Sequence, residues 1–117
     1  MSTQSKGYVL AIIDVFDPQT FSEYTSRTPS VIEEFGGHFV LRGTEYELME
    51  SSSKVEGNLK KNRIVLVEFN SVEIARQFYN STNYQFAATF RRASAFTELY
   101  ILSEYLLDNM KLLPLEH

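Results

Sequence analysis

The 117-residue sequence contains no cysteine and no tryptophan, and it holds only two histidines. Without cysteine the chain cannot form disulfides, thiolate nucleophiles, zinc–thiolate sites or iron–sulfur clusters. One histidine, His117, belongs to residues 115–117, which we interpret as the start of a vector-encoded purification tag. His38 is then the single native histidine, and a histidine-rich metal site is not expected. The sequence therefore predicts a protein with no metal and no bound cofactor.

Long apolar runs are also missing. The longest, residues 8–13, is far too short to span a membrane. Residues 1–7 are polar, lack the apolar region of a signal peptide, and are expected to be a disordered N-terminus. The net charge of −4 does not favour nucleic acid or an anionic membrane surface as a partner. Together these absences predict a cytoplasmic protein that binds neither nucleic acid nor membrane.

The chain does have enough apolar material for one core. Hydrophobic residues make up 44% of it, including nine phenylalanines and seven tyrosines. This composition and length suit one domain that folds without covalent cross-links. We place that domain at residues 8–104 and a C-terminal tail at residues 105–114, where a short helix is expected at 106–113.

Alternating and β-branched patterns predict four strands, the second of which is expected to continue to Glu50 through a bulge at Gly43. They lie at residues 8–15, 38–42, 63–69 and 96–104. The polar, lysine-bearing residues 51–62 are expected to form a hairpin tip.

Helical patterns fall between the strands. Asp17 is expected to cap the first helix, Pro29 to break or kink it, and Gly36-Gly37 to end it. Asn70 is expected to cap a second helix, and Ser81 another that ends near Arg92. The resulting order, strand–helix–strand–strand–helix–strand, predicts a ferredoxin-like α+β fold with an antiparallel sheet and the helices on one face.

The two faces of the predicted sheet differ in polarity. One alternating set is entirely apolar and is expected to lie under the helices: Val9, Ala11, Ile13, Val15, Phe39, Leu41, Val65, Val67, Phe69, Leu99 and Ile101. The other set includes Leu10, Ile12, Val40, Ile64, Leu66 and Leu102. Such a patch is larger than monomers usually expose, and covering it is worth several kcal/mol at ~25 cal/mol per Å2. We therefore expect a homodimer formed through the helix-free sheet face.

The sequence resembles the small bacterial family called domain of unknown function 1330 over residues 8–104. The residues that carry the resemblance are Asp14, Asp17-Pro18, Tyr24, Pro29, Gly36-Gly37, Arg42-Gly43, Glu50, Arg63, Phe69-Asn70-Ser71, Ala75, Tyr79, Ser81, Tyr84 and Arg91. Three features depart from the family pattern: another basic residue usually stands at the position of His38, the 51–62 loop is longer, and the tail after Glu104 is additional.

The resemblance implies a dimeric α/β barrel, in which two ferredoxin-like sheets face each other. The wider superfamily includes cofactor-free monooxygenases, haem-degrading enzymes, muconolactone isomerases and stress-related domains. The family itself has no settled activity, so the resemblance implies a pocket without choosing a chemistry.

One group of candidate site residues lies on the strands. His38 and Arg42 are four apart and share a face of a regular strand, and Asp14 is on the matching face of the neighbouring strand. In this reading His38 and Asp14 are catalytic and Arg42 anchors an anion, because histidine titrates near neutrality and arginine grips carboxylates. The alternative reading is an Asp14–Arg42 ion pair at a dimer interface, with His38 at its rim.

A second group lies on the helices. Tyr24 is expected to face inward, and Tyr84 and Arg91 share a helix face, so all three are candidate ligand-binding residues. The alternative is two core tyrosines and a cation that stabilises a helix C-terminus. These residues can meet Arg42 only if the pocket opens at a sheet edge or if an irregularity at Gly43 turns Arg42 around. The family resemblance, which carries both groups, favours one shared site.

Two functions remain open. The first is a metal-free small-molecule enzyme, oxygenase- or isomerase-like, that acts on an organic acid or an aromatic compound. The second is a non-catalytic homodimeric module for ligand binding or stress response. The sequence contains no phosphate-binding loop, dinucleotide fingerprint or serine–histidine–aspartate order that would point to a different enzyme class.

Overall fold

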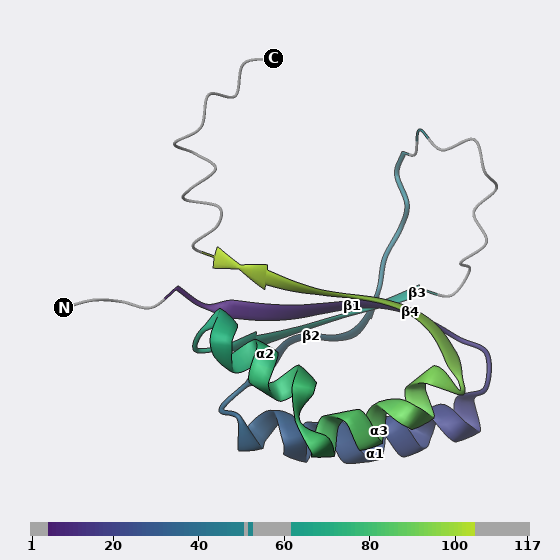
Figure 1. Cartoon of the computed structure of the whole chain (residues 1–117). Coiled ribbons are helices and arrows are strands. Elements are labelled where there is room, and N and C mark those ends of the chain that lie inside the picture. Colours follow the sequence, from purple (N-terminus) through teal and green to yellow (C-terminus); the bar gives the residue numbers. More distant parts are fainter. Residues whose placement is uncertain (1–4, 51, 53–61, 105–117) are drawn as a thin grey trace.

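The computed structural model describes residues 5–50, 52 and 62–104. Within them a four-stranded antiparallel sheet carries three helices on one face (Figure 1). The elements are β1 (Gly7–Val15), α1 (Pro18–Glu34), β2 (His38–Glu45), β3 (Asn62–Phe69), α2 (Val72–Asn80), α3 (Thr82–Arg92) and β4 (Ala95–Ser103). The strand order β2-β3-β1-β4 confirms the predicted ferredoxin-like α+β fold.

Several predictions fall on residues outside this description. They are the tail at 105–114 with its helix, the tag residues 115–117, most of the predicted N-terminal disordered segment, and almost all of the 51–62 hairpin tip. In the part of the chain that is described, no helix is long and apolar enough to cross a membrane.

Helix α1 begins as predicted and runs farther than predicted. The Asp17 carboxylate accepts a hydrogen bond of 3.2 Å from the backbone N–H of Thr20, and Pro18 occupies the first turn. Of the break or kink predicted at Pro29, the break is wrong, because the helix continues to Glu34. The Thr28 hydroxyl, just before the proline, donates to the Tyr24 carbonyl at 2.6 Å and supports the turn that Pro29 weakens.

The other helix ends follow from local hydrogen bonds. After α1, Gly36 adopts φ 74°, and the N–H groups of Gly36 and Gly37 bond the carbonyls of Glu33 and Ile32. The cap of α2 is Ser71, whose hydroxyl accepts from the Ile74 N–H at 3.1 Å, so the predicted cap at Asn70 is one residue early.

Strand β2 contains two register shifts against β3. Phe39 lies opposite Val67, but Leu41 lies opposite Leu66 and Arg42 opposite Val65. The first shift, at Val40, reverses which face the following residues occupy. Leu41, expected under the helices, therefore lies on the helix-free face, and Arg42, expected on the helix-free face, lies on the helix side.

The second register shift is at Gly43, where a bulge was predicted. Its φ of 72° suits glycine, which has no Cβ to clash in the left-handed region. Strand β2 ends at Glu45, so the expected continuation to Glu50 is wrong.

The core fills the space between the sheet and the helices unevenly. Phe69, Phe78 and Tyr84 are almost fully buried, and their rings stack beneath the part of the sheet that α2 covers. Helix α1 packs chiefly against α3 and makes few close approaches to the strands. This arrangement leaves room between α1 and the sheet.

The helix-free face is apolar across its middle. One row across the four strands reads Leu41, Leu66, Leu10 and Tyr100. Val40 and Leu102 on the same side of the domain are 48% and 41% exposed. The apolar patch predicted on the helix-free face is therefore present, and it includes Leu41 as well.

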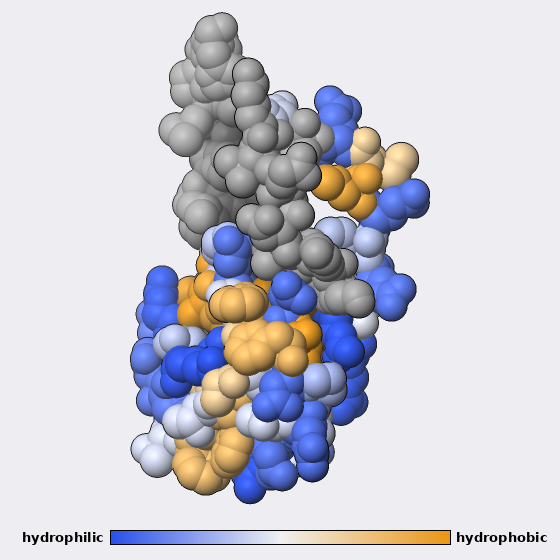
Figure 2. Space-filling view, turned by 90° about the vertical axis from the view of Figure 1, so that its right-hand side faces the viewer, coloured by the Kyte–Doolittle hydropathy of each residue, from blue (hydrophilic) through white to orange (hydrophobic). Residues whose placement is uncertain are grey.

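Apolar side chains also reach the surface at one end of the domain. Figure 2 shows hydrophobic residues between polar ones on the side seen from the right of Figure 1. Phe16 and Phe96, beside the β1–α1 and α3–β4 connections, have ring centroids 5.0 Å apart and are 55% and 63% exposed.

Candidate functional site

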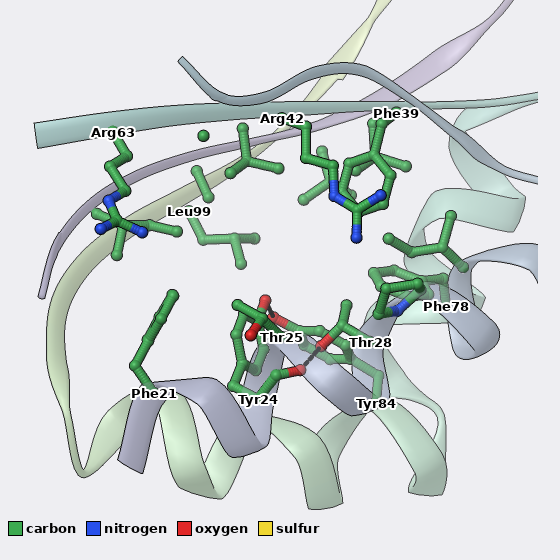
Figure 3. A pocket seen from close by; sticks show the side chains of 18 residues that line it. Phe21, Tyr24, Thr25, Thr28, Phe39, Arg42, Arg63, Phe78, Tyr84 and Leu99 are labelled. Carbon is green, nitrogen blue, oxygen red and sulfur yellow. Dashed lines mark hydrogen bonds between the residues drawn. The ribbon is translucent and has the colours of Figure 1, made fainter. Parts of the chain in front are cut away.

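A cavity of about 250 Å3 lies between the helix side of the sheet and α1 (Figure 3). Its apolar walls come from both layers and are formed by Val9, Ala11, Ile13, Phe21, Pro29, Ile32, Phe39, Val65, Val67, Phe78 and Leu99. Its polar groups belong to Tyr24, Thr25, Thr28, Arg42, Arg63 and Tyr84. An apolar cavity with a few polar groups is the usual form of a small-molecule site.

Arg42 reaches this cavity because of the β2 bulge. It stands beside Val65 on the helix side, and Figure 3 shows its side chain extending from the sheet into the cavity. The guanidinium carbon lies 4.3 Å from the centroid of the Phe39 ring, a cation–π contact that holds the group beside one wall. Among the described residues Arg42 has no ion-pair partner, so its hydrogen-bond donors are available to an anion.

Arg63 adds a second guanidinium at another part of the cavity. It comes from β3, and in Figure 3 it lies on the far side of Leu99 from Arg42. No aspartate or glutamate is among the described residues that line the cavity. Two cations without an acid make this space electrostatically favourable for a negatively charged ligand.

Two tyrosines from the helices line the side of the cavity opposite the sheet. The hydroxyls of Tyr24 on α1 and Tyr84 on α3 are 2.9 Å apart and hydrogen-bonded. Tyr84 is only 1% exposed. Burial, reinforced by the neighbouring Tyr84, raises the pKa of Tyr24 far above its usual value, so this phenol stays neutral at physiological pH.

Arg91 lies behind the tyrosine pair rather than in the cavity wall. Its guanidinium carbon is 5.7 Å from the centroid of the Tyr24 ring, and the residue is 6% exposed. Its Nε has no hydrogen-bond partner among the described residues. Burial lowers the pKa of Arg91, but its interactions with Tyr84 and Tyr24 outweigh this and leave the pKa raised, so the charge is retained.

The structure separates the predicted catalytic residues from this cavity. His38 lies on the helix-free face, where its Nε2 is 2.9 Å from a Glu68 carboxylate oxygen. Tyr8 donates to the same carboxylate at 3.2 Å. Asp14 is six residues along β1 from Tyr8, a separation of about 20 Å. The predicted Asp14–His38–Arg42 cluster is therefore not assembled, and neither is the alternative Asp14–Arg42 ion pair.

The sequence predicted one shared site for Tyr24, His38, Arg42, Tyr84 and Arg91. Of these, Tyr24, Arg42 and Tyr84 line the cavity, Arg91 lies behind its wall, and His38 lies on the opposite face of the sheet. The reason given for the turn of Arg42 was incomplete. It named Gly43 as the irregularity able to turn Arg42, whereas the shift before Arg42 occurs at Val40. Valine suits a regular strand, so the sequence gives no local signal for that bulge. Phe39 and Arg63 were not proposed as site residues, and only their strand positions could have suggested them. The described residues contain no cluster of three or more histidine or acidic side chains suited to a metal ion.

Comparison with known proteins agrees with this fold. The profile of a family described as domain of unknown function (DUF1330) matches residues 6–105. No curated protein matches the chain.

Solved structures similar to this one include the following three. A protein of unknown function from Rhodopseudomonas palustris is 18% identical, with a TM-score of 0.67 over 85% of this chain and 82% of that chain. SnoaB, a cofactor-independent oxygenase from Streptomyces nogalater, is 14% identical, with a TM-score of 0.55 over 84% of this chain and 91% of that chain. A dimeric ferredoxin-like protein of unknown function from Bacteroides fragilis is 7% identical, with a TM-score of 0.55 over 87% of this chain and 99% of that chain. At these identities the likeness concerns the fold alone.

Proposed function

The chain belongs to the DUF1330 family of domains of unknown function, and on that premise we propose that it binds a small organic acid in the cavity between the sheet and α1. The apolar or aromatic body of the ligand fills the cavity, and its carboxylate pairs with Arg42. The observation that carries this proposal is the guanidinium of Arg42, which lies against Phe39 and extends into the cavity. Within the part of the chain that the structure describes, it has no ion-pair partner and no acid lines that cavity.

The energetics favour an amphipathic anion over a purely polar one. Most of the cavity wall is aliphatic or aromatic, so each Å2 of apolar ligand surface removed from water contributes ~25 cal/mol. A carboxylate paired with a guanidinium keeps its hydrogen bonds on leaving water, which offsets much of its desolvation cost. The cavity volume lies just below the usual range for ligand sites, which suits a compound with about one ring.

Cofactor-independent oxygenation of the bound acid is a second candidate function. The observation that favours it is the structural similarity to SnoaB, which is named as such an oxygenase. In this chain, guanidinium groups beside the ligand stabilise the negative charge that forms when a substrate loses a proton. The polar groups of the cavity belong to arginines, tyrosines and threonines, so the substrate would have to ionise without a carboxylate or imidazole base from this wall.

The assembly we propose is a homodimer through the helix-free face. The row containing Leu41, Leu66 and Leu10 is apolar, and a structural relative is described as dimeric. Covering this row with a second copy removes apolar surface from water without changing the cavity on the opposite face.

Isothermal titration calorimetry with benzoate tests the ligand proposal. Arg42→Ala should weaken benzoate binding about ten- to one-hundredfold, because it removes hydrogen bonds between two charged groups. The matched control is Arg76→Ala on α2, which removes the same charge from an exposed arginine that pairs with Glu73 outside the cavity. No binding by the unmodified protein, or an equal loss in both variants, would contradict the proposal.

A further inference from the structure

The paired hydroxyls of Tyr24 and Tyr84 have one hydrogen to spare. Two hydroxyls carry two hydrogens, and the bond of 2.9 Å between them uses one. No described residue accepts the other from either hydroxyl. Both tyrosines line the cavity, so the remaining donor is positioned for an oxygen atom of a ligand.

Arg91 determines which kind of oxygen suits this donor. A guanidinium has only donors, so it cannot accept the spare hydrogen. It lies against the Tyr24 ring and is 6% exposed, and no carboxylate pairs with it among the described residues. A buried cation without a counter-ion stabilises negative charge nearby, because the protein interior screens charges weakly.

We infer that the Tyr24 and Tyr84 hydroxyls, backed by Arg91, form an oxyanion site at the helix side of the cavity that takes the ionised oxygen of a phenolic ligand. This inference rests on the proposed function and narrows it. The ligand is a hydroxylated aromatic acid, with its carboxylate at Arg42 and its phenolic oxygen at the tyrosine pair. Arg91 is a positioning residue here, since it acts through the two hydroxyls.

The charges around the site support an ionised ligand oxygen. Arg42 and Arg63 enter from the strands, Tyr24 and Tyr84 from the helices, and Arg91 lies behind them. Among the described residues, no acidic side chain lines the cavity to compete for the donor. We expect these cations to outweigh the burial that raises the pKa of Tyr24, so that the site favours the phenolate and lowers the pKa of a bound phenol.

Spectrophotometric titration of 4-nitrophenol tests this inference, because phenol and phenolate absorb at different wavelengths. Its apparent pKa when bound should fall by about one unit below that of the free compound, a tenfold change in ionisation. Tyr24→Phe and Tyr84→Phe should each remove most of this shift, and Arg91→Met should reduce it. Arg76→Met is the control, since it removes an exposed arginine outside the cavity. Thermal unfolding of each variant shows which of them are folded. One folded tyrosine variant is sufficient for the test.

Parallel titration with benzoate separates this inference from the proposed function. If 4-nitrophenol does not bind, binds without a shift in pKa, or keeps its shift in a folded tyrosine variant, the oxyanion site is wrong. Arg42-dependent binding of benzoate would still support the proposed function in that case. A tyrosine-dependent shift without benzoate binding would support the oxyanion site and contradict the carboxylate role of Arg42.

Discussion

Arg42 and His38 show that one extra residue in a strand can decide which side chains share a site. In a regular strand these residues share a face. The shift at Val40 sends Arg42 into the cavity and leaves His38 beside Glu68 on the opposite side of the sheet. The sequence supplied the correct cation but could not supply its direction.

The first prediction concerns pH. Histidine is the side chain whose charge ordinarily changes near neutrality, and His38 lies outside the cavity. The raised pKa of Tyr24 and the retained charge of Arg91 keep both groups in one protonation state there. Benzoate affinity should therefore be constant between about pH 6 and 8.

His38→Ala provides the control for this pH profile. Calorimetry should show the same affinity for benzoate as the unmodified protein, and stability should change by less than about 1 kcal/mol, because the His38–Glu68 pair is solvent-exposed on the histidine side. A step in affinity near neutral pH that disappears in this variant would place His38 in the site after all.

At the scale of elements, helix and strand types follow from the sequence more reliably than their boundaries and bulges. Asp17, Gly36 and Ser81 act where their local chemistry predicts. Pro29 does not break α1, because packing of the helix on α3 outweighs one lost backbone hydrogen bond. The cavity exists because α1 packs on α3 rather than down onto the sheet, and that separation has no signature in hydrophobic periodicity.

The second prediction compares two glycines. Gly43 has a positive φ but open space around it, so Gly43→Ala should cost about 1–2 kcal/mol from backbone strain alone. At Gly7, where β1 crosses the start of α2, a Cβ would lie 2.5 Å from the Ser71 carbonyl oxygen. Gly7→Ala should cost more, about 3 kcal/mol, because backbone cannot yield as a side chain can. Urea unfolding followed by circular dichroism measures both.

Gly43→Asn distinguishes strain from packing at that position. Asparagine tolerates the left-handed region better than alanine, so this variant should recover part of the loss. Equal destabilisation by Gly7→Ala and Gly43→Ala would contradict the close approach of β1 to α2.

At the scale of the whole molecule, the two sheet faces have separate tasks in this account. The helix side holds the ligand cavity, and the helix-free side holds the proposed dimer contact. The apolar character of both faces was predictable from alternation, since their residues follow a period of two. The face that carries the site was not predictable, because it depends on the register shift at Val40 and on the packing of α1.

The third prediction tests the dimer. Light scattering at micromolar concentration should give twice the chain mass of 13.5 kDa. Leu41→Asp should shift the protein to monomer, because it places an unpaired charge in an apolar contact. Phe86→Asp is the control, since Phe86 is 57% exposed but lies on α3, away from the helix-free face. A monomeric unmodified protein, or dissociation by both variants alike, would count against the interface.

The central claim is that the cavity between the sheet and α1 holds an organic acid through Arg42. The most direct measurement is a benzoate titration followed by two-dimensional 15N NMR, including the Arg Nε region. The largest chemical-shift changes should fall on Arg42, Gly43 and Thr25, which line the cavity. Changes centred instead on His38 and Glu68, or no localised change at saturating benzoate, would contradict it.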